Sequence, residues 1–186
     1  MKKVAGVDEV GRGSLIGPVY AAAVILNKNI NKKVLKDSKI LSRNRREILA
    51  TYIKKNSIWA VGKASAKEIE KINILNASLL AMKRAIKNLK KKPELVLIDG
   101  NKLPDMKNYN LRSVIKGDQK IASISAASII AKVSRDKMII KLGKKFKGYN
   151  WSQNFGYGTR QHLKSIKRLG ISPHHRKTFS PFKRKK

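Results

Sequence analysis

Short apolar segments alternate with segments of helical periodicity, and this alternation constrains the fold more than any other feature of the sequence. The apolar runs are five to eight residues long, a length that suits buried strands. They lie at 3–10, 19–26, 57–64, 94–98 and 111–115. Helical spacing and capping signals predict helices within 42–55, 66–72, 77–90, 122–146 and 159–169. Strands come first and then alternate with helices, which indicates an α/β fold with helices packed on one sheet.

The chain has 186 residues, a length that suits one domain. We expect a sheet core in residues 1–121 and a helical C-terminal region with a basic tail in 122–186. No apolar run is long enough for a transmembrane helix, and no apolar stretch follows the first lysines as in a signal peptide. We therefore expect a cytoplasmic protein without a membrane partner. The absence of cysteine excludes disulfides, thiol catalysis and cysteine zinc sites.

The charge balance is strongly basic, with 44 Lys and Arg against 11 Asp and Glu, a formal net charge of +33. Such a chain is attracted to polyanions, of which nucleic acid is the obvious one. Lys, Ile and Asn also have A/T-rich codons, so an A/T-rich genome could supply much of the excess. The charge therefore supports a nucleic-acid partner and says nothing about catalysis.

The few acidic residues include four that follow apolar strands. Asp8 and Glu9 end one such run, Asp99 ends another, and Asp118 follows a third. Ligands collect at the carboxyl ends of strands in open α/β sheets, and clustered carboxylates repel unless a cation intervenes. Oxygen ligands favour Mg²⁺ or Mn²⁺ over Zn²⁺. The alternatives are that Asp99 is a turn residue and that Asp118 is a turn residue or a helix cap.

The adjacent pair Asp8 and Glu9 presents a geometric difficulty. Neighbouring residues of a regular strand point to opposite faces. Both side chains can serve one site only if the strand ends or bulges at Glu9, and the Gly-Arg-Gly that follows makes this plausible.

Two glycine-rich loops are candidates for substrate contacts. Gly11, Arg12 and Gly13 could bring backbone N–H groups and a planar cation to a phosphate or sugar, or could form a plain turn. Tyr157 lies between glycines and could stack on a sugar or base, while Thr159 could cap the next helix. The three histidines, His162, His174 and His175, are interpreted as surface or packing residues.

Six ordered blocks resemble the ribonuclease HII family over nearly the whole chain. They are AGVDEVGRGSLIGPV at 5–19, DSKILS at 37–42, NILNAS at 73–78, VLIDGN at 96–101, KGDQKIASISAASIIAKVSRD at 116–136 and FGYGT at 155–159. The resemblance implies a ribonuclease H-like fold, in which helices flank a mixed five-stranded sheet and a helical C-terminal region follows. One departure is QKIAS at 119–123, where some relatives have a proline and an acid.

The resemblance also implies functional residues. The family's four catalytic, metal-binding acids map onto Asp8, Glu9, Asp99 and Asp118, with Asp136 in a supporting place. Its Gly-Arg-Gly maps onto Gly11, Arg12 and Gly13, which would read the 2′-hydroxyl at the cleavage site. Its tyrosine maps onto Tyr157, which would pack on the neighbouring sugar, and Lys39 would contact phosphate.

The implied activity is divalent-metal-dependent hydrolysis, with Mn²⁺ or Mg²⁺, of the RNA strand of RNA–DNA hybrids. It would include incision 5′ of single ribonucleotides in duplex DNA by a two-metal mechanism, leaving 3′-hydroxyl and 5′-phosphate ends. The partners would be these duplexes, bound by a monomer. The sister type, ribonuclease HIII, carries an N-terminal domain and usually lacks the arginine of Gly-Arg-Gly, so we expect type HII.

Two alternatives remain open. A non-catalytic basic nucleic-acid-binding protein would fit the charge alone. A junction-cutting nuclease of the same fold would ignore a 2′-hydroxyl, which the Gly-Arg-Gly and tyrosine motifs argue against.

Overall fold

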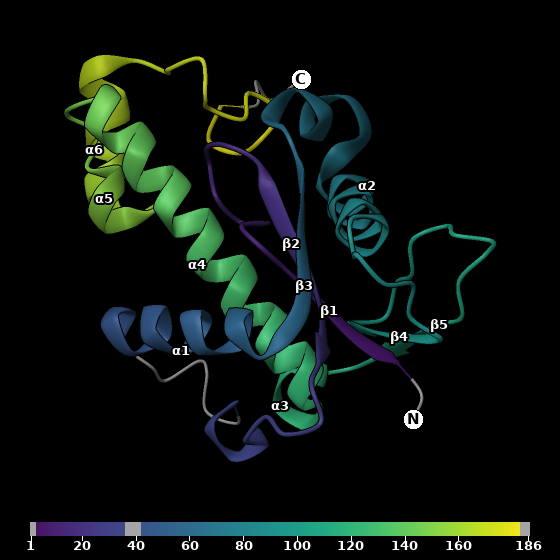
Figure 1. The fold of residues 1–186 in the computed structure, drawn as a ribbon. Coiled ribbons are helices and arrows are strands. Elements are labelled where there is room, and N and C mark those ends of the chain that lie inside the picture. The colour runs from purple at the N-terminus through teal and green to yellow at the C-terminus, as the bar shows by residue number, and fades with distance from the viewer. Residues whose placement is uncertain (1–2, 36–41, 183–186) are drawn as a thin grey trace.

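The computed structural model describes residues 3–35 and 42–182, and its centre is a five-stranded mixed sheet (Figure 1). The strands are β1 (Val4–Val10), β2 (Val19–Leu26), β3 (Ser57–Ala64), β4 (Leu95–Asp99) and β5 (Leu111–Val114). Their order is β3-β2-β1-β4-β5. The β3-β2-β1 half is antiparallel, and β1, β4 and β5 run parallel. The mixed sheet confirms the predicted fold class, and every predicted strand is present to within a residue or two.

The helices also follow the sequence pattern. They are η1 (Lys32–Leu35), α1 (Arg43–Lys55), α2 (Ala66–Lys87), α3 (Gly117–Lys120), α4 (Ala122–Lys145), α5 (Trp151–Asn154) and α6 (Arg160–Leu169). Ser42 caps α1 as predicted, because its side chain accepts a hydrogen bond from the N–H of Arg45. The two helices expected at 66–72 and 77–90 form α2, which is kinked at Asn73, where φ is 64°. The short elements η1, α3 and α5 were not predicted.

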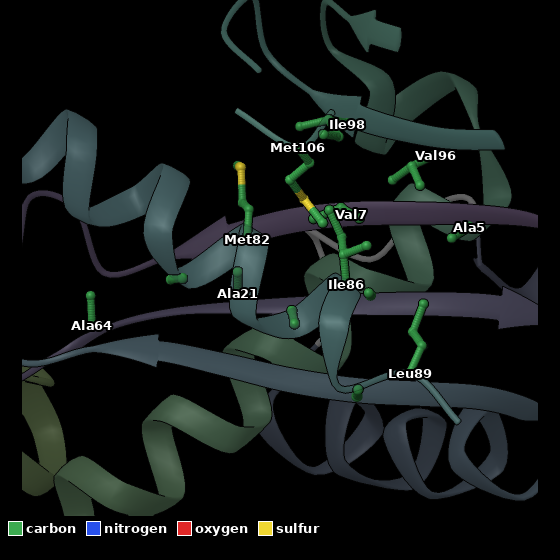
Figure 2. Close-up of a cluster of buried hydrophobic side chains, with 14 of the residues drawn as sticks. Ala5, Val7, Ala21, Ala64, Met82, Ile86, Leu89, Val96, Ile98 and Met106 are labelled. Atoms are coloured by element: carbon green, nitrogen blue, oxygen red, sulfur yellow. The ribbon is translucent and has the colours of Figure 1, made fainter. Parts of the chain in front are cut away.

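Helices cover both faces of the sheet. In β2, Ala21, Ala23 and Ile25 face the core shared with α2, whereas Ala22 and Val24 face the core shared with α1 and α4. Figure 2 shows the α2 core, in which Met82 and Ile86 point toward β1 and β4. The alternation along β2 thus separates the two layers.

Two glycines let the helices lie close to the sheet. A Cβ on Gly62 of β3 would lie 2.1 Å from the carbonyl oxygen of Ala81 in α2, and one on Gly6 of β1 would lie 2.1 Å from the carbonyl carbon of Ser123 in α4. Neither position can hold a side chain without moving a helix. The start of α4 is therefore fixed against the strand that carries Asp8 and Glu9.

A third apolar cluster joins the segment between β1 and β2 to the helical C-terminal region. Leu15 and Ile16 pack against Ile139, Tyr149 and Trp151. Isolated β-bridges pair Ser14 with Tyr157 and Ile16 with His175. Within the described residues, no helix is both long enough and apolar enough to cross a membrane.

Candidate active site

Asp8 and Asp99 lie on neighbouring parallel strands at the same level of the sheet. The last registered pair of β1 and β4 is Val7 with Ile98, so the next residues along the two strands are the two aspartates. Val7 and Ile98 face α2, so both aspartates face the α4 side. Adjacent strands are about 4.8 Å apart, which brings the two carboxylates together as the sequence predicts.

Burial and negative neighbours make Asp8 resist ionisation. Asp8 is 6% exposed. Burial is the main cause that raises its pKa to about 8, the charges of Glu9 and Asp99 raise it further, and a hydrogen bond with Ser128 opposes the shift. The backbone N–H of Glu9 also donates to Asp8 Oδ1 at 2.7 Å. The site therefore concentrates more negative charge than its surroundings neutralise.

β1 neither ends nor bulges at Glu9, contrary to the prediction that would let Asp8 and Glu9 share one site. The β1–β2 ladder continues regularly through Glu9 with Ala21 and Val10 with Tyr20, because the apolar run of β2 is long enough to pair the whole of β1. Glu9 therefore points to the face opposite Asp8, where its Oε1 lies 3.3 Å from Arg12 Nη1. Burial raises the pKa of Glu9, Arg12 lowers it and Asp99 raises it, so Glu9 still shares the electrostatics of the aspartate pair.

Asp118 is tied to Asp99 through the preceding residue. The N–H of Gly117 donates to Asp99 Oδ1 at 2.7 Å, and a Cβ on Gly117 would lie 2.6 Å from Ile124 Cδ1. Asp118 is buried within α3 and lines a cavity of about 640 Å³ together with Lys3 and other residues. This short helix was not predicted. It places Asp118 next to Gly117, the residue whose N–H donates to Asp99.

The four acids supply oxygen donors suited to Mg²⁺ or Mn²⁺. Within residues 3–35 and 42–182, no three Asp, Glu or His side chains lie close enough together to hold an ion. The fit to a divalent cation therefore rests on the donor chemistry and on the raised pKa of Asp8, and the carboxylates have to turn toward one another to bind it.

The two glycine-rich loops meet beside the acids. The Ser14–Tyr157 bridge is reinforced by the N–H of Leu15, which donates to the carbonyl of Gly156 at 2.8 Å. Nothing lies within 4 Å of a Cβ placed on Gly13, so its backbone is open to a ligand. Thr159 caps α6 through a hydrogen bond from the N–H of His162, as the alternative interpretation of this loop expected. Lys39, a predicted phosphate contact, lies outside the described residues.

Gly11 differs from Gly13 in what surrounds it. Its φ is +92°, and a Cβ there would lie 2.3 Å from Arg135 Nε. The missing side chain therefore makes room for an arginine of this chain. Sequence reasoning missed Arg135 and Arg176, which are both 0% exposed, because arginine is ordinarily a surface residue. The only sequence signal was the Arg135-Asp136 pair at the end of a matching block.

His162 and His175 are packing residues, as predicted. His162 is fully buried and accepts a hydrogen bond from Trp151 Nε1 at Nε2, at 2.9 Å. Its Nδ1 lies 2.9 Å from the carbonyl oxygen of Tyr157, so it supports the loop that carries this tyrosine.

The mixed sheet, with helices on both faces and with Asp8 and Asp99 side by side on adjacent parallel strands, is that of a ribonuclease H-like nuclease. The crystal structure of the ribonuclease H2 from Pyrococcus horikoshii OT3 matches with a TM-score of 0.80 at 29% identity, over 97% of this chain and 95% of that chain. A chain in the structure of the PCNA:RNase HII complex from Archaeoglobus fulgidus matches with a TM-score of 0.68 at 28% identity, over 89% of this chain and 87% of that chain.

The sequence narrows this class to one family. The family described as Ribonuclease HII matches residues 5–182. A ribonuclease HII from Pelagibacter ubique (strain HTCC1062) is 75% identical over 181 residues, which cover 97% of each chain. The chain belongs to the ribonuclease HII family, and it is a hydrolase with the endonuclease activity of a ribonuclease H.

Proposed function

We propose that this enzyme cuts the RNA strand of RNA–DNA hybrids and incises duplex DNA 5′ of single embedded ribonucleotides. The observation that carries the proposal is the pairing of buried Asp8 with half-buried Asp99 on adjacent strands of a family member, beside two linked glycine-rich loops. The products would carry 3′-hydroxyl and 5′-phosphate ends.

In this proposal, Asp8, Glu9, Asp99 and Asp118 hold two divalent ions, Mn²⁺ or Mg²⁺. Glu9 reaches the ions past the end of β4, where it is near enough to Asp99 for that charge to raise its pKa. Such ions activate a water and stabilise the leaving 3′-oxygen. The chain's own contribution is to place and orient the acids. Gly117 fixes Asp99 through its N–H, and Ser128 favours the ionised form of Asp8. The remaining negative charge makes cation binding favourable at this place.

The two loops would read the ribose. Gly13 offers an unobstructed backbone, and Arg12, with a side chain 51% exposed, offers a cation beside Glu9. Tyr157 packs on the sugar of the ribonucleotide, and Lys39 contacts phosphate. A monomer would bind the duplex through phosphates, so binding weakens as salt rises.

The decisive test is Asp8→Asn, assayed on a DNA duplex with one ribonucleotide in Mg²⁺, Mn²⁺ or chelator. We expect metal-dependent cutting 5′ of the ribonucleotide by the wild type, and loss of turnover with retained duplex binding in the variant. Asp105→Asn, at an exposed position in the loop between β4 and β5, is the matched control and stays active. Cutting by Asp8→Asn at the wild-type rate would overturn the role of the acids, and binding without any metal-dependent cutting would favour the non-catalytic alternative.

Tyr157 is tested separately. Tyr157→Ala lowers cleavage at a single ribonucleotide more than it lowers duplex binding, because the ring orients the sugar. Tyr109→Ala is the control, because the ring of Tyr109 lies under Lys92 as the ring of Tyr157 lies under Lys132. An unchanged cleavage rate in Tyr157→Ala contradicts the proposed contact.

A further inference from the structure

Two arginines lie fully buried beneath the two candidate substrate loops. Arg135 in α4 and Arg176 near the C-terminus are both 0% exposed. Arg135 Nη1 lies 3.9 Å from the carboxylate of Asp136, and both guanidinium groups donate hydrogen bonds to backbone carbonyls. Within the described chain, Arg135 Nε and Nη1 and Arg176 Nη2 have no hydrogen-bond partner. Burying a cation so incompletely compensated is costly, so a packing role alone does not explain these residues.

Arg176 holds both ends of the loop that follows β1. Its Nε donates to the carbonyl of Gly17 at 2.8 Å, and its Nη1 donates to the carbonyl of Arg12 at 2.9 Å. Its backbone N–H also donates to the carbonyl of Leu15 at 2.8 Å. Three bonds from one residue therefore fix the conformation of residues 12–17.

Arg135 joins the same loop to the tyrosine loop. Its guanidinium lies against the α-carbon of Gly11, where a side chain could not fit. Its Nη2 donates to the carbonyl of Phe155 at 3.1 Å, and its Cζ lies 5.4 Å from the ring centroid of Tyr157. Arg135 thus contacts the first glycine of one loop and the start of the other.

Resting on the proposed function, we propose that Arg135 and Arg176 are positioning residues for recognition of the 2′-hydroxyl. They lock the Gly11–Gly13 loop and the Tyr157 loop into one fixed surface, on which Gly13 and Tyr157 meet the ribose. Gly11 serves this surface by leaving room for Arg135 beneath it.

A guanidinium suits this task better than other side chains. Its planar fork reaches two carbonyls at fixed angles, as Arg176 does with Arg12 and Gly17. An apolar residue of the same length would fill the space and leave those buried carbonyls without donors. Two buried cations also make the potential beneath the loops positive, which favours a phosphodiester strand above them.

The test measures 2′-hydroxyl preference as the ratio of dissociation constants for an all-DNA duplex and the same duplex with one ribonucleotide. Binding is measured in chelator, and kcat and KM for cleavage are measured in Mg²⁺. The variants are Arg176→Met, Arg176→Lys and Arg135→Met, each assayed below its own Tm. Arg84→Met is the matched control, because Arg84 also donates to a backbone carbonyl, that of Lys63, but on the distant helix α2.

Misplacing a substrate-reading group by about 1 Å costs on the order of 100-fold, so we expect the Met variants to lose at least about 10-fold in preference and in kcat. Arg176→Lys keeps the positive charge without the planar guanidinium, and it loses less preference and less kcat than Arg176→Met. Arg84→Met lowers Tm but keeps the preference. A folded Arg176→Met variant with wild-type preference would overturn the inference, and if that variant does not fold, wild-type preference in Arg176→Lys does the same. A wild type that shows no preference and no cleavage at the ribonucleotide overturns the proposed function itself.

Discussion

Asp8→Asn is expected to stabilise the metal-free protein while it removes activity. The pKa of Asp8 rises from 3.8 to about 8, so between these values the folded protein binds a proton that the unfolded chain has released. The raised pKa of this acid therefore lowers stability as pH rises through that window. From 3.8 to pH 7 is about three pH units at about 1.4 kcal/mol each, so the raised pKa of Asp8 lowers the free energy of unfolding by about 4 kcal/mol at pH 7.

Asparagine removes this cost and keeps an oxygen for the N–H of Glu9. We expect urea unfolding in chelator to give a variant that is more stable by about 2–4 kcal/mol at pH 7, with the difference vanishing near pH 4. Asp105→Asn, at an exposed position, shows no such difference. Adding Mn²⁺ stabilises the wild type more than the variant, because the ion takes over the neutralising role. Equal stabilities at pH 7 and pH 4 in chelator would refute the reasoning from burial and like charges.

Three further predictions concern the frame around the site. Gly62→Ala lowers the free energy of unfolding by about 3 kcal/mol, because its methyl group meets the backbone of α2, whereas Gly13→Ala leaves denaturant stability unchanged. Burial lowers the pKa of His175 from 6.5 to about 4, so between these values the unfolded chain takes up a proton that the folded protein does not. The free energy of unfolding therefore falls by about 3 kcal/mol as pH drops from 6.5 to 4, and a His175→Gln variant lacks this pH dependence. His162 is neutral with its proton on Nδ1, because Nε2 accepts from Trp151, and nitrogen NMR of the folded protein should find that tautomer near pH 7.

The sheet and long helices were predictable because each depends on a local pattern. The apolar run 19–26 is β2, and Ser42 begins α1 as a capping residue should. The division of α2 at Asn73 was also visible, because the apolar spacing breaks there. The four-residue helices α3 and α5 were missed, since elements of one turn have no periodicity to detect.

At the site, the prediction that Asp8 and Asp99 meet at one edge of the sheet is confirmed, because it depends on strand direction, whereas the pairing of β1 with β4 was not predicted. The side of the strand taken by Glu9 was mispredicted, because pairing with β2 depends on a partner that lies farther along the chain. The buried arginines could not be predicted, since composition marks arginine as exposed and only tertiary packing closes over Arg135 and Arg176.

The bonds from Arg176 to Gly17 and Arg12 also have a consequence for synthesis. Arg176 lies 159 positions after Gly17 and 164 positions after Arg12. One of the two strands that pair with β1 is β4, which is translated much later than β1 and β2. A nascent chain can therefore form the β1–β2 hairpin early, with its acidic pair already in place. The loop over residues 12–17 takes its final conformation only after residue 176 has been translated. If the proposed function holds, selective cutting waits for this step, and a chain that stops just before residue 176 has the acids on their sheet without a fixed loop over residues 12–17.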